Sequence, residues 1–523
     1  MRVIARASPS RILVLLVAAA ALVPAALTPL TPDVAGTLTV SRRLLDGAHL
    51  YRDVIEYAPP LIFLLGLPIE AIARVTGWPE WPLVIIAVIA LAAASLTLVR
   101  RLLPFDGLGV TTMVGAVVML LASAARDFGQ PDHLALILLL PCIVWCARQA
   151  TGDALNLSRG ARIGVGVMTG VCLALKPIFA IVYLALLAYV AGSRRKGDVL
   201  RALEQRIVAI GVATYLIAIL LFMPDYLWRV LPMAYVQHWI YGDPIGPMVS
   251  DWMVVSVVVS SLVLVLFGPW LTRGGEWGTL VRACALTSLT MFLAFVLQRD
   301  ASPVYFLPAR ALNFLAAWLA AVGFARSLLT PSKQPVMLAL RTVAIALAIV
   351  PPGVVWSLIY EVQSVDYANA QAGLRSPFVE PLIDVVRQRA AGKPIFVLSS
   401  SIGPAFPLVN LTDATWPYRF KSLEFVSIYY KDVDNPATAA YRPPSAQSAG
   451  ERAFFDDVVD DLTRRPPALL IVDVTRLKQG FGLTYFDFLT YYRQSPAFGA
   501  LLRHYRLIEW KKNFQVFEYQ PSR

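Results

Sequence analysis

ILVLLVAAAALVPAAL, residues 12–27, is followed at once by a polar loop that opens with Thr31-Pro32-Asp33. Apolar runs near the ~20 residues that cross a bilayer recur along the first two thirds of the chain. Of the 523 residues, 57% are hydrophobic and 15% are charged, and the mean hydropathy is +0.63. This composition excludes an ordinary soluble protein and predicts a polytopic α-helical membrane protein.

The formal net charge of +12 fits nucleic-acid binding or the excess of Lys and Arg in the cytoplasmic loops of membrane proteins. We favour the second interpretation because the basic residues lie in short clusters between apolar runs. The cysteines also lie in apolar segments without disulfide or zinc-binding spacing, which predicts buried thiols. They are Cys142, Cys146, Cys172 and Cys284.

The basic clusters predict a membrane path, because an even number of crossings must separate neighbouring clusters if all are cytoplasmic. The clusters lie near residues 100–101, 148–162, 194–201, 273–282 and 326–341. Two apolar runs separate each neighbouring pair, roughly 108–125 and 134–147, 163–175 and 178–192, 207–223 and 252–271, and 283–298 and 303–325.

The ends of this path need separate arguments. The first run has the profile of a cleavable signal peptide, but the many later runs favour a retained span with a cytoplasmic N-terminus. Residues 61–72 are too short to cross, so we expect a helix that lies along the membrane or re-enters it within the first outer loop. Residues 83–99 form the next crossing, and a last run at about 336–359 exits to the outside. The prediction is about eleven spans, within a transmembrane domain of residues 1–360.

After residue 360 the charges return and the long apolar runs end. Strand-like stretches at 394–398 and 469–473 alternate with helical patterns at 381–390 and 451–464, and residues 505–519 predict a β-hairpin. Residues 361–523 are therefore predicted to form a small extracytoplasmic α/β domain.

The first outer loop continues with LLDGAHLYRD at residues 44–53 and EYAPP at residues 56–60. This order of an early Asp, Gly-x-x-x-Tyr-x-Asp and Pro-Pro resembles the first extracytoplasmic loop of GT-C class glycosyltransferases. That class includes protein O-mannosyltransferases and lipid A aminoarabinose transferases. The resemblance implies that Asp33 is the general base that takes a proton from the acceptor hydroxyl. A helix cap or a plain loop carboxylate is the alternative, and we place Glu56 among the substrate-binding residues.

The second outer turn, RDFGQPDH at residues 126–133, carries four ionisable groups between two spans, where such groups are functional candidates by default. The resemblance matches Asp132 to a second acidic residue of the class, which orients the acceptor or helps to position a metal. Asp127 is a further catalytic candidate, and Arg126 and His133 are substrate-binding candidates. The alternative is a surface pair between Arg126 and Asp127, which contributes little.

Lys176-Pro177 interrupts an apolar stretch at an outer turn, where a lone ammonium costs ~2.5–3.5 kcal/mol on insertion scales. The class has a similar Lys-Pro that contacts the donor phosphate, so the resemblance implies this role for Lys176. Snorkelling to the interface is the alternative. The fourth outer turn resembles the basic residue and Tyr-x-x-Pro of the class, which makes Arg299, Tyr305 and Arg310 candidates for the same phosphate.

Two further patterns favour structural interpretations. The aromatic residues between positions 224 and 251 are more typical of an interfacial belt than of sugar stacking. An acidic run falls at helical spacing, which favours a solvated helix face over a metal cluster. Its members are Asp456, Asp457, Asp460 and Asp461.

The predicted function is a glycosyltransferase of the inner (plasma) membrane. It moves a sugar from a polyprenyl-phosphate donor to an envelope glycan, lipid or protein acceptor on the outer face, with inversion. A transporter or flippase of lipid-linked sugars, or an inactive scaffold of the same fold, is the alternative. Tyr57-Ala58 stand where the aminoarabinose branch has Glu-Lys, so the sugar, the acceptor and a divalent metal at this loop stay open. Membrane lipids are the other expected partners, and we expect no binding to nucleic acid.

Overall fold

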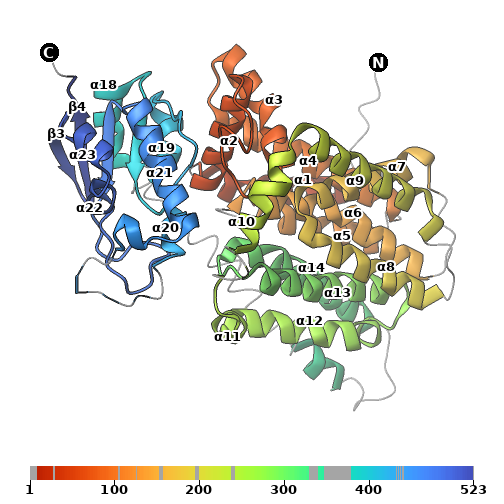
Figure 1. The fold of residues 1–523 in the computed structure, drawn as a ribbon. Helices are drawn as coiled ribbons and strands as arrows, with labels where there is room; N and C mark the ends of the chain where they lie inside the picture. Colours follow the sequence, from red (N-terminus) through yellow and green to blue (C-terminus); the bar gives the residue numbers. More distant parts are fainter. Residues whose placement is uncertain are drawn as a thin grey trace, which may run out of the picture. The chain divides into compact units, whose positions relative to one another are not determined.

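The computed structural model describes residues 9–27, 30–103, 107–124, 127–151, 157–194, 200–236, 239, 242–328, 340–346, 379–430, 433, 435, 437–438 and 441–521. The chain forms two compact units, each assembled from separate segments (Figure 1). We call residues 1–28, 81–222 and 242–367 the helical unit, and residues 29–80, 223–241 and 368–523 the mixed unit. The boundary predicted between residues 360 and 361 lies outside the described residues.

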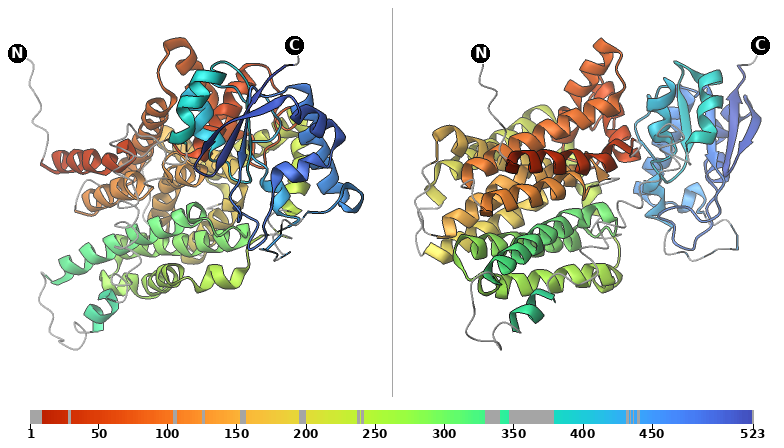
Figure 2. Two further views of the ribbon diagram at one scale, coloured as in Figure 1. Left: turned by 90° about the vertical axis from the view of Figure 1, so that its left-hand side faces the viewer. Right: turned by 180° about the vertical axis from the view of Figure 1, so that it is seen from behind.

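The helical unit consists of helices that run roughly side by side (Figure 2). They are α1 (Pro9–Leu27), α4 (Glu80–Leu102), α5 (Gly107–Leu121), α6 (Pro131–Thr151), α7 (Arg159–Leu175), the 3₁₀ turn η2 (Pro177–Phe179), α8 (Ala180–Arg194), α9 (Leu203–Phe222), α11 (Ile245–Ser250), α12 (Trp252–Leu271), α13 (Gly275–Gln298) and α14 (Pro303–Leu328).

Six helices of the described residues are long and apolar enough to cross a membrane, namely α4, α6, α9, α12, α13 and α14. Shorter apolar helices occupy the predicted runs at 12–27, 108–125 and 178–192, and α7 occupies the run at 163–175. The last predicted run is helical at 340–346 and otherwise lies outside the described residues. The polytopic helical architecture is confirmed, and the total of about eleven spans stays a prediction.

The core of the helical unit lies around α6 and α13. Helix α6 is apolar on all sides and buried along nearly its whole length, as expected for a helix enclosed by others. Helix α13 packs against α6, α12 and α14. The buried Asn313 of α14 donates from Nδ2 to the hydroxyls of Ser260 and Ser261 in α12, at 3.0 and 2.9 Å. Such interhelical hydrogen bonds hold apolar helices together in a membrane, where lipid tails are as apolar as the side chains and the hydrophobic effect does not drive helices to associate.

Helix α9 shows the opposite pattern, because its apolar side chains point outward. Ile210 and Leu221 are 65% and 66% exposed, and neighbouring leucines are also exposed. A continuous apolar surface of this kind is unfavourable in water and is expected where a helix faces lipid.

The mixed unit combines the first outer loop with the C-terminal segment. Its elements are α2 (Pro32–Leu45), α3 (Leu61–Thr76), the π-helical turn η4 (Tyr226–Val230), α10 (Leu231–Tyr235), α18 (Glu380–Ala390), β1 (Ile395–Leu398), α19 (Ala405–Thr412), α20 (Glu424–Ser427), η6 (Pro444–Ala446), α21 (Ala449–Arg464), β2 (Leu469–Asp473), α22 (Phe488–Arg493), α23 (Pro496–Leu502), β3 (Tyr505–Lys511) and β4 (Phe514–Tyr519). The predicted strands, helices and hairpin of the C-terminal region are confirmed.

The sheet of the mixed unit has the order β1-β2-β4-β3. Strands β1 and β2 are parallel, and β4 pairs antiparallel with both β2 and β3. The buried strands β1 and β2 read IFVL and LLIVD, the near-continuous apolar pattern of strands that are covered on both faces. The β3–β4 hairpin forms one edge of the sheet, with β3 outermost, and β1 is the other edge strand (Figure 2).

Helices α2 and α3 form a tight hairpin that positions the start of α2. A Cβ added at Gly66 would lie 2.2 Å from Oγ of Ser41, so only glycine allows this approach. The Ser41 hydroxyl donates to the carbonyl of Phe63 at 2.8 Å. Helix α2 also packs against α19 of the C-terminal segment. The helix expected at 61–72 is therefore present as α3, and it is short of a full span.

Candidate active site

Asp33 lies in the first turn of α2, directly after Pro32 at the first helical position. Proline is preorganised for that position, and a carboxylate in the first turn interacts favourably with the helix N-terminus. The Asp33 side chain stays exposed although the residues that follow it on α2 are buried. The carboxylate is therefore accessible to a substrate while its backbone is fixed.

A buried ion pair lies close to Asp33 within the mixed unit. Nζ of Lys421 is 2.9 Å from Oε2 of Glu56, and the two side chains are 19% and 9% exposed. The other carboxylate oxygen of Glu56, Oε1, is buried without a hydrogen-bond partner among the described residues. Two carboxylates, those of Asp33 and Glu56, thus share the field of one ammonium.

Charge and burial act in opposite directions on this cluster. The Asp33 side chain is open to solvent at one side, but the protein atoms packed around its carboxylate desolvate it and raise its pKa above the ordinary value, and the positive charge of Lys421 partly opposes that rise. Burial likewise raises the pKa of Glu56, Lys421 opposes the rise, and the charge of Asp33 adds to it. Burial alone would lower the pKa of Lys421, but Glu56 and Asp33 outweigh it and leave that pKa raised. Asp33 is therefore a stronger base than an ordinary aspartate, and Lys421 moderates that basicity.

Lys421 ends a segment, residues 416–421, that is bound tightly to the first loop. The amide of Ile55 donates to the carbonyl of Arg419 at 2.8 Å, and the indole nitrogen of Trp416 donates to the carbonyl of Phe420 at 3.0 Å. The guanidinium of Arg43 donates to the carbonyls of Tyr418 and, at 3.1 Å, of Asp53. The segment therefore places Lys421 beside Glu56 by backbone contacts.

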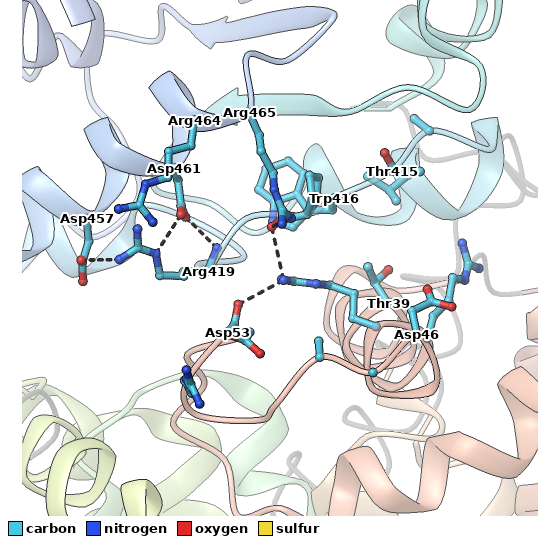
Figure 3. A pocket seen from close by; sticks show the side chains of 18 of the residues that line it. Thr39, Asp46, Asp53, Thr415, Trp416, Arg419, Asp457, Asp461, Arg464 and Arg465 are labelled. Atoms are coloured by element: carbon cyan, nitrogen blue, oxygen red, sulfur yellow. Dashed lines mark hydrogen bonds and ion pairs between the residues drawn. The ribbon is translucent and has the colours of Figure 1, made fainter. Parts of the chain in front are cut away.

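The acidic run of α21 also holds this segment. The guanidinium of Arg419 contacts the carboxylate of Asp457, and its Nε lies 2.8 Å from Oδ1 of Asp461 (Figure 3). The same guanidinium also contacts the carboxylate of Asp460. Three of the four aspartates of the predicted solvated helix face therefore bind one arginine, Arg419.

A cavity of about 920 Å³ opens beside the 416–421 segment, within the mixed unit. Six arginines and five aspartates line it, and Figure 3 labels Arg419, Arg464 and Arg465 among them. Neither Asp33 nor Lys421 lines this cavity. Most of its charged groups bind one another or backbone carbonyls, so we interpret it as the groove behind the segment and not as the reaction site.

Lys176 and Asp132 meet in the helical unit. Nζ of Lys176 lies 2.7 Å from Oδ2 of Asp132 and donates to Oε1 of Gln298 at 2.9 Å. The ammonium also lies 4.3 Å from the centre of the Tyr305 ring, a cation–π distance. The side chains of Lys176 and Asp132 are 14% and 2% exposed. Helices α6, α7, α13 and α14 thus converge on one ammonium.

The other candidates of the second outer turn bind their own surroundings. The amide of Gly129 donates to Nδ1 of His133, and Nε2 of the same ring lies 2.6 Å from the carbonyl of Leu120. Both ring nitrogens are thus engaged, which indicates a structural histidine. Asp127 is buried and accepts from Gln130 at 3.3 Å. Arg126 lies outside the described residues.

The fourth outer turn behaves similarly. Arg299 donates from Nε to the carbonyl of Asp243 at 2.8 Å and from Nη2 to that of Gly242 at 3.2 Å. Arg310 is buried within α14. In the loop between these helices, burial raises the pKa of Asp300, and the Ser302 amide opposes that rise. Tyr305 alone among the three candidates of this turn has a recorded contact with Lys176 in the described residues.

Sequence reasoning missed Lys421, Gln298 and the arginines that hold the 416–421 segment. No local pattern marks Lys421, since a single lysine in a polar segment is ordinary. The described residues contain no group of three or more His, Cys, Asp or Glu side chains that could hold a metal ion. The described cysteines are buried free thiols, as predicted.

No protein-family model and no curated protein matches the sequence. Among solved structures, the chain is similar to ArnT from Cupriavidus metallidurans bound to undecaprenyl phosphate, with a TM-score of 0.55 and 13% identity over 97% of both chains. The apo state of the same protein gives a TM-score of 0.54 and 14% identity over 98% of both chains. Arabinofuranosyltransferase AftD from Mycobacteria gives a TM-score of 0.41 and 14% identity over 99% of this chain and 40% of that chain.

At 13–14% identity the likeness to ArnT concerns the fold, and it extends over nearly the whole of both chains. ArnT is a GT-C protein, so the resemblance inferred from short loop motifs is confirmed at the level of the fold. The chain therefore has a GT-C-like fold, mostly helical, with apolar candidate spans and a small C-terminal sheet.

Proposed function

We propose that this protein is a membrane glycosyltransferase that moves a sugar from a polyprenyl-phosphate donor to a glycan, lipid or protein acceptor. The observation that carries the proposal is the near full-length likeness to ArnT, a structure of which contains undecaprenyl phosphate. An accessible carboxylate at the start of α2, flanked by Glu56 and Lys421, supplies the chemistry that such a reaction requires.

In this reaction Asp33 takes the proton of an acceptor hydroxyl as its oxygen attacks the anomeric carbon of the sugar. The bond between that carbon and the phosphate oxygen breaks, and polyprenyl phosphate leaves with the bonding electrons. A single displacement inverts the anomeric carbon. Asp132 serves in positioning groups and does not take the proton, because its carboxylate is paired with Lys176.

Lys176 is the proposed contact for the donor phosphate. An ammonium has three N–H donors. Among the described residues, Asp132 and Gln298 accept two hydrogen bonds from Lys176, so the third N–H is available to a phosphate oxygen. Tyr305 lies beside the same ammonium, and an arginine adds a bidentate contact in the manner typical of phosphate sites. Arg299 and Arg310 remain the candidates for that arginine.

The reaction is assigned to the outer face of the inner (plasma) membrane, with the N-terminus in the cytoplasm and residues 361–523 outside. This placement rests on the distribution of basic clusters between the apolar runs. A lipid-borne donor suits it, because a polyprenyl-phosphate sugar reaches the outer face within the bilayer.

The test is glycosyl transfer by the purified protein in lipid nanodiscs. A labelled polyprenyl-phosphate sugar is incubated with envelope extract from a deletion strain, and the labelled product is identified by mass spectrometry. The proposal expects transfer by the wild type and transfer slowed ~10²–10⁴-fold by Asp33→Asn. Movement of the labelled lipid across proteoliposomes without any transfer would instead identify a transporter, and neither activity would indicate an inactive scaffold.

A further inference from the structure

The Lys421 ammonium lies among the carboxylates of the first outer loop although it comes from the C-terminal segment. We propose that Lys421 is a positioning residue of the transfer reaction, which keeps the Asp33 carboxylate charged and ready to take the acceptor's proton. The inference rests on the proposed function and deepens it, since it makes the C-terminal segment part of the reaction machinery.

The first support is the path of the lysine side chain across α2. A Cβ added at Gly36 would lie 3.0 Å from Cδ of Lys421 and 3.1 Å from Cδ1 of Ile402. Gly36 follows Asp33 by three positions, so both lie on the same face of the helix. Glycine at position 36 therefore lets the lysine stem pass along the face that carries Asp33.

The second support is the rigidity of the segment that delivers the lysine. The residue before Lys421, Phe420, is held through its carbonyl by Trp416, and Arg419 is held through its carbonyl by Ile55. The Arg419 guanidinium is fixed by three carboxylates of α21. A group that acts on a reaction from a distance needs such fixed placement, because small displacements weaken its effect.

The third support is the balance of charge around Asp33. The titratable groups that act on one another in this cluster are Asp33 and Glu56 of the first loop and Lys421 and Glu424 of the C-terminal segment. Lys421 is the cation among them. Burial alone would favour the neutral form of Asp33. The neutral form is already protonated and cannot act as the general base. Lys421 offsets that effect, and it stays paired with Glu56 when Asp33 becomes protonated.

The proposal predicts the sign of a pH effect. Because Lys421 lowers the pKa of Asp33, its removal raises that pKa and leaves less of the charged base at a given acidic pH. The acidic limb of the kcat/KM profile then moves to higher pH.

The experiment measures the ionisation of Asp33 directly, so that it needs no substrate. Carbodiimide labels protonated carboxyl groups, and mass spectrometry of the peptide that contains Asp33 gives the extent of labelling against pH in the full-length protein. The peptide with the exposed Asp413 serves as the internal reference. The variants are Lys421→Met and Gly36→Val, where the second displaces the lysine stem and keeps every charged group of the cluster. Lys393→Met, at an exposed lysine, and Gly211→Val, where an added Cβ meets nothing within 4 Å, are the matched controls.

The proposal expects the labelling midpoint of Asp33 to move to higher pH in Lys421→Met and Gly36→Val and to stay unchanged in both controls. An unchanged midpoint in Gly36→Val and Lys421→Met would overturn it. If Lys421→Met fails to fold because Glu56 loses its partner, Gly36→Val still decides. A shifted midpoint in a protein that transfers no sugar would refute the proposed function alone, whereas transfer with unshifted midpoints would refute the role of Lys421 alone.

Discussion

Burial and the charge of Lys421 act in opposite directions on the pKa of Asp33, as they do on that of Glu56, but only Asp33 has an exposed side chain. We expect Asp33→Asn to lose ~10²–10⁴-fold in turnover, the usual contribution of a general base. Asp46→Asn is the matched control, since Asp46 is exposed and pairs with Arg74 at 2.8 Å. Glycosyl transfer by purified variants is the measurement. Near wild-type turnover of Asp33→Asn, together with an inactive Asp132→Asn, would assign the base to Asp132.

The Lys176–Asp132 pair predicts a stability effect at the same scale. Removing one partner of a buried pair leaves a lone buried charge and costs ~3–5 kcal/mol. Lys176→Met is therefore expected to lower the unfolding temperature, and Lys176→Met combined with Asp132→Asn to recover most of the loss. Both variants should bind polyprenyl phosphate more weakly than the wild type. Thermal unfolding and donor binding in the same detergent separate the two effects, and equal stability of the single and double variants would contradict the pairing.

Candidate site residues could be identified from the sequence where a charged residue interrupts an apolar run. Asp132 and Lys176 stand out for that reason, and the structure brings them within 2.7 Å. His133 stood out by the same signal, yet its ring nitrogens bind neighbouring backbone groups. Lys421 gave no signal in the sequence. Its role depends on Glu56 and Asp33 in a loop that is distant along the chain, and not on its sequence neighbours. A polar residue at a membrane turn can thus be found from sequence, but its partner often cannot.

At the scale of elements, the 416–421 segment predicts that α21 influences turnover from a distance. Arg419→Met removes the group that binds three carboxylates and frees the segment that carries Lys421. A misplacement of about 1 Å can cost ~10²-fold in rate, so kcat should fall while KM for the donor changes little. Arg452→Met is the matched control, because its exposed pair with Asp456 on the same helix is worth ~0–1 kcal/mol. Equal kcat values for the two variants would contradict the prediction.

The bounds of several helices and strands could be predicted because they depend on local sequence patterns. Hydrophobic length placed helices such as α12 and α14, and alternation with turn residues placed the β3–β4 hairpin. The grouping of elements did not follow, since α2 and α3 belong with the C-terminal segment and not with the spans that flank them. Glycine at position 66 and the packing of α19 on α2 decide that grouping, and both are tertiary contacts.

At the scale of the whole molecule, the basic clusters predict the orientation in the membrane. Reporter fusions after Ser193 and after Gln520 should give signals from opposite compartments, with Ser193 in the cytoplasm. A reporter that is active only in the cytoplasm and one that is active only outside, placed at each site, provide the control for expression. The same compartment for both sites would contradict the predicted topology.

The mixed unit has a further consequence for how the protein is made. Residues 29–80 of this unit emerge early from the ribosome, and the segment that supplies Lys421 emerges much later. At ~5–20 residues per second, the 388 residues from Asp33 to Lys421 take some tens of seconds to synthesise. During that interval the loop that carries Asp33 lacks the ammonium of Lys421. An unfinished chain therefore has an incomplete cluster around Asp33. The cluster of Asp33, Glu56 and Lys421 can therefore form only after most of the chain has been synthesised, so the site of the proposed reaction is assembled late.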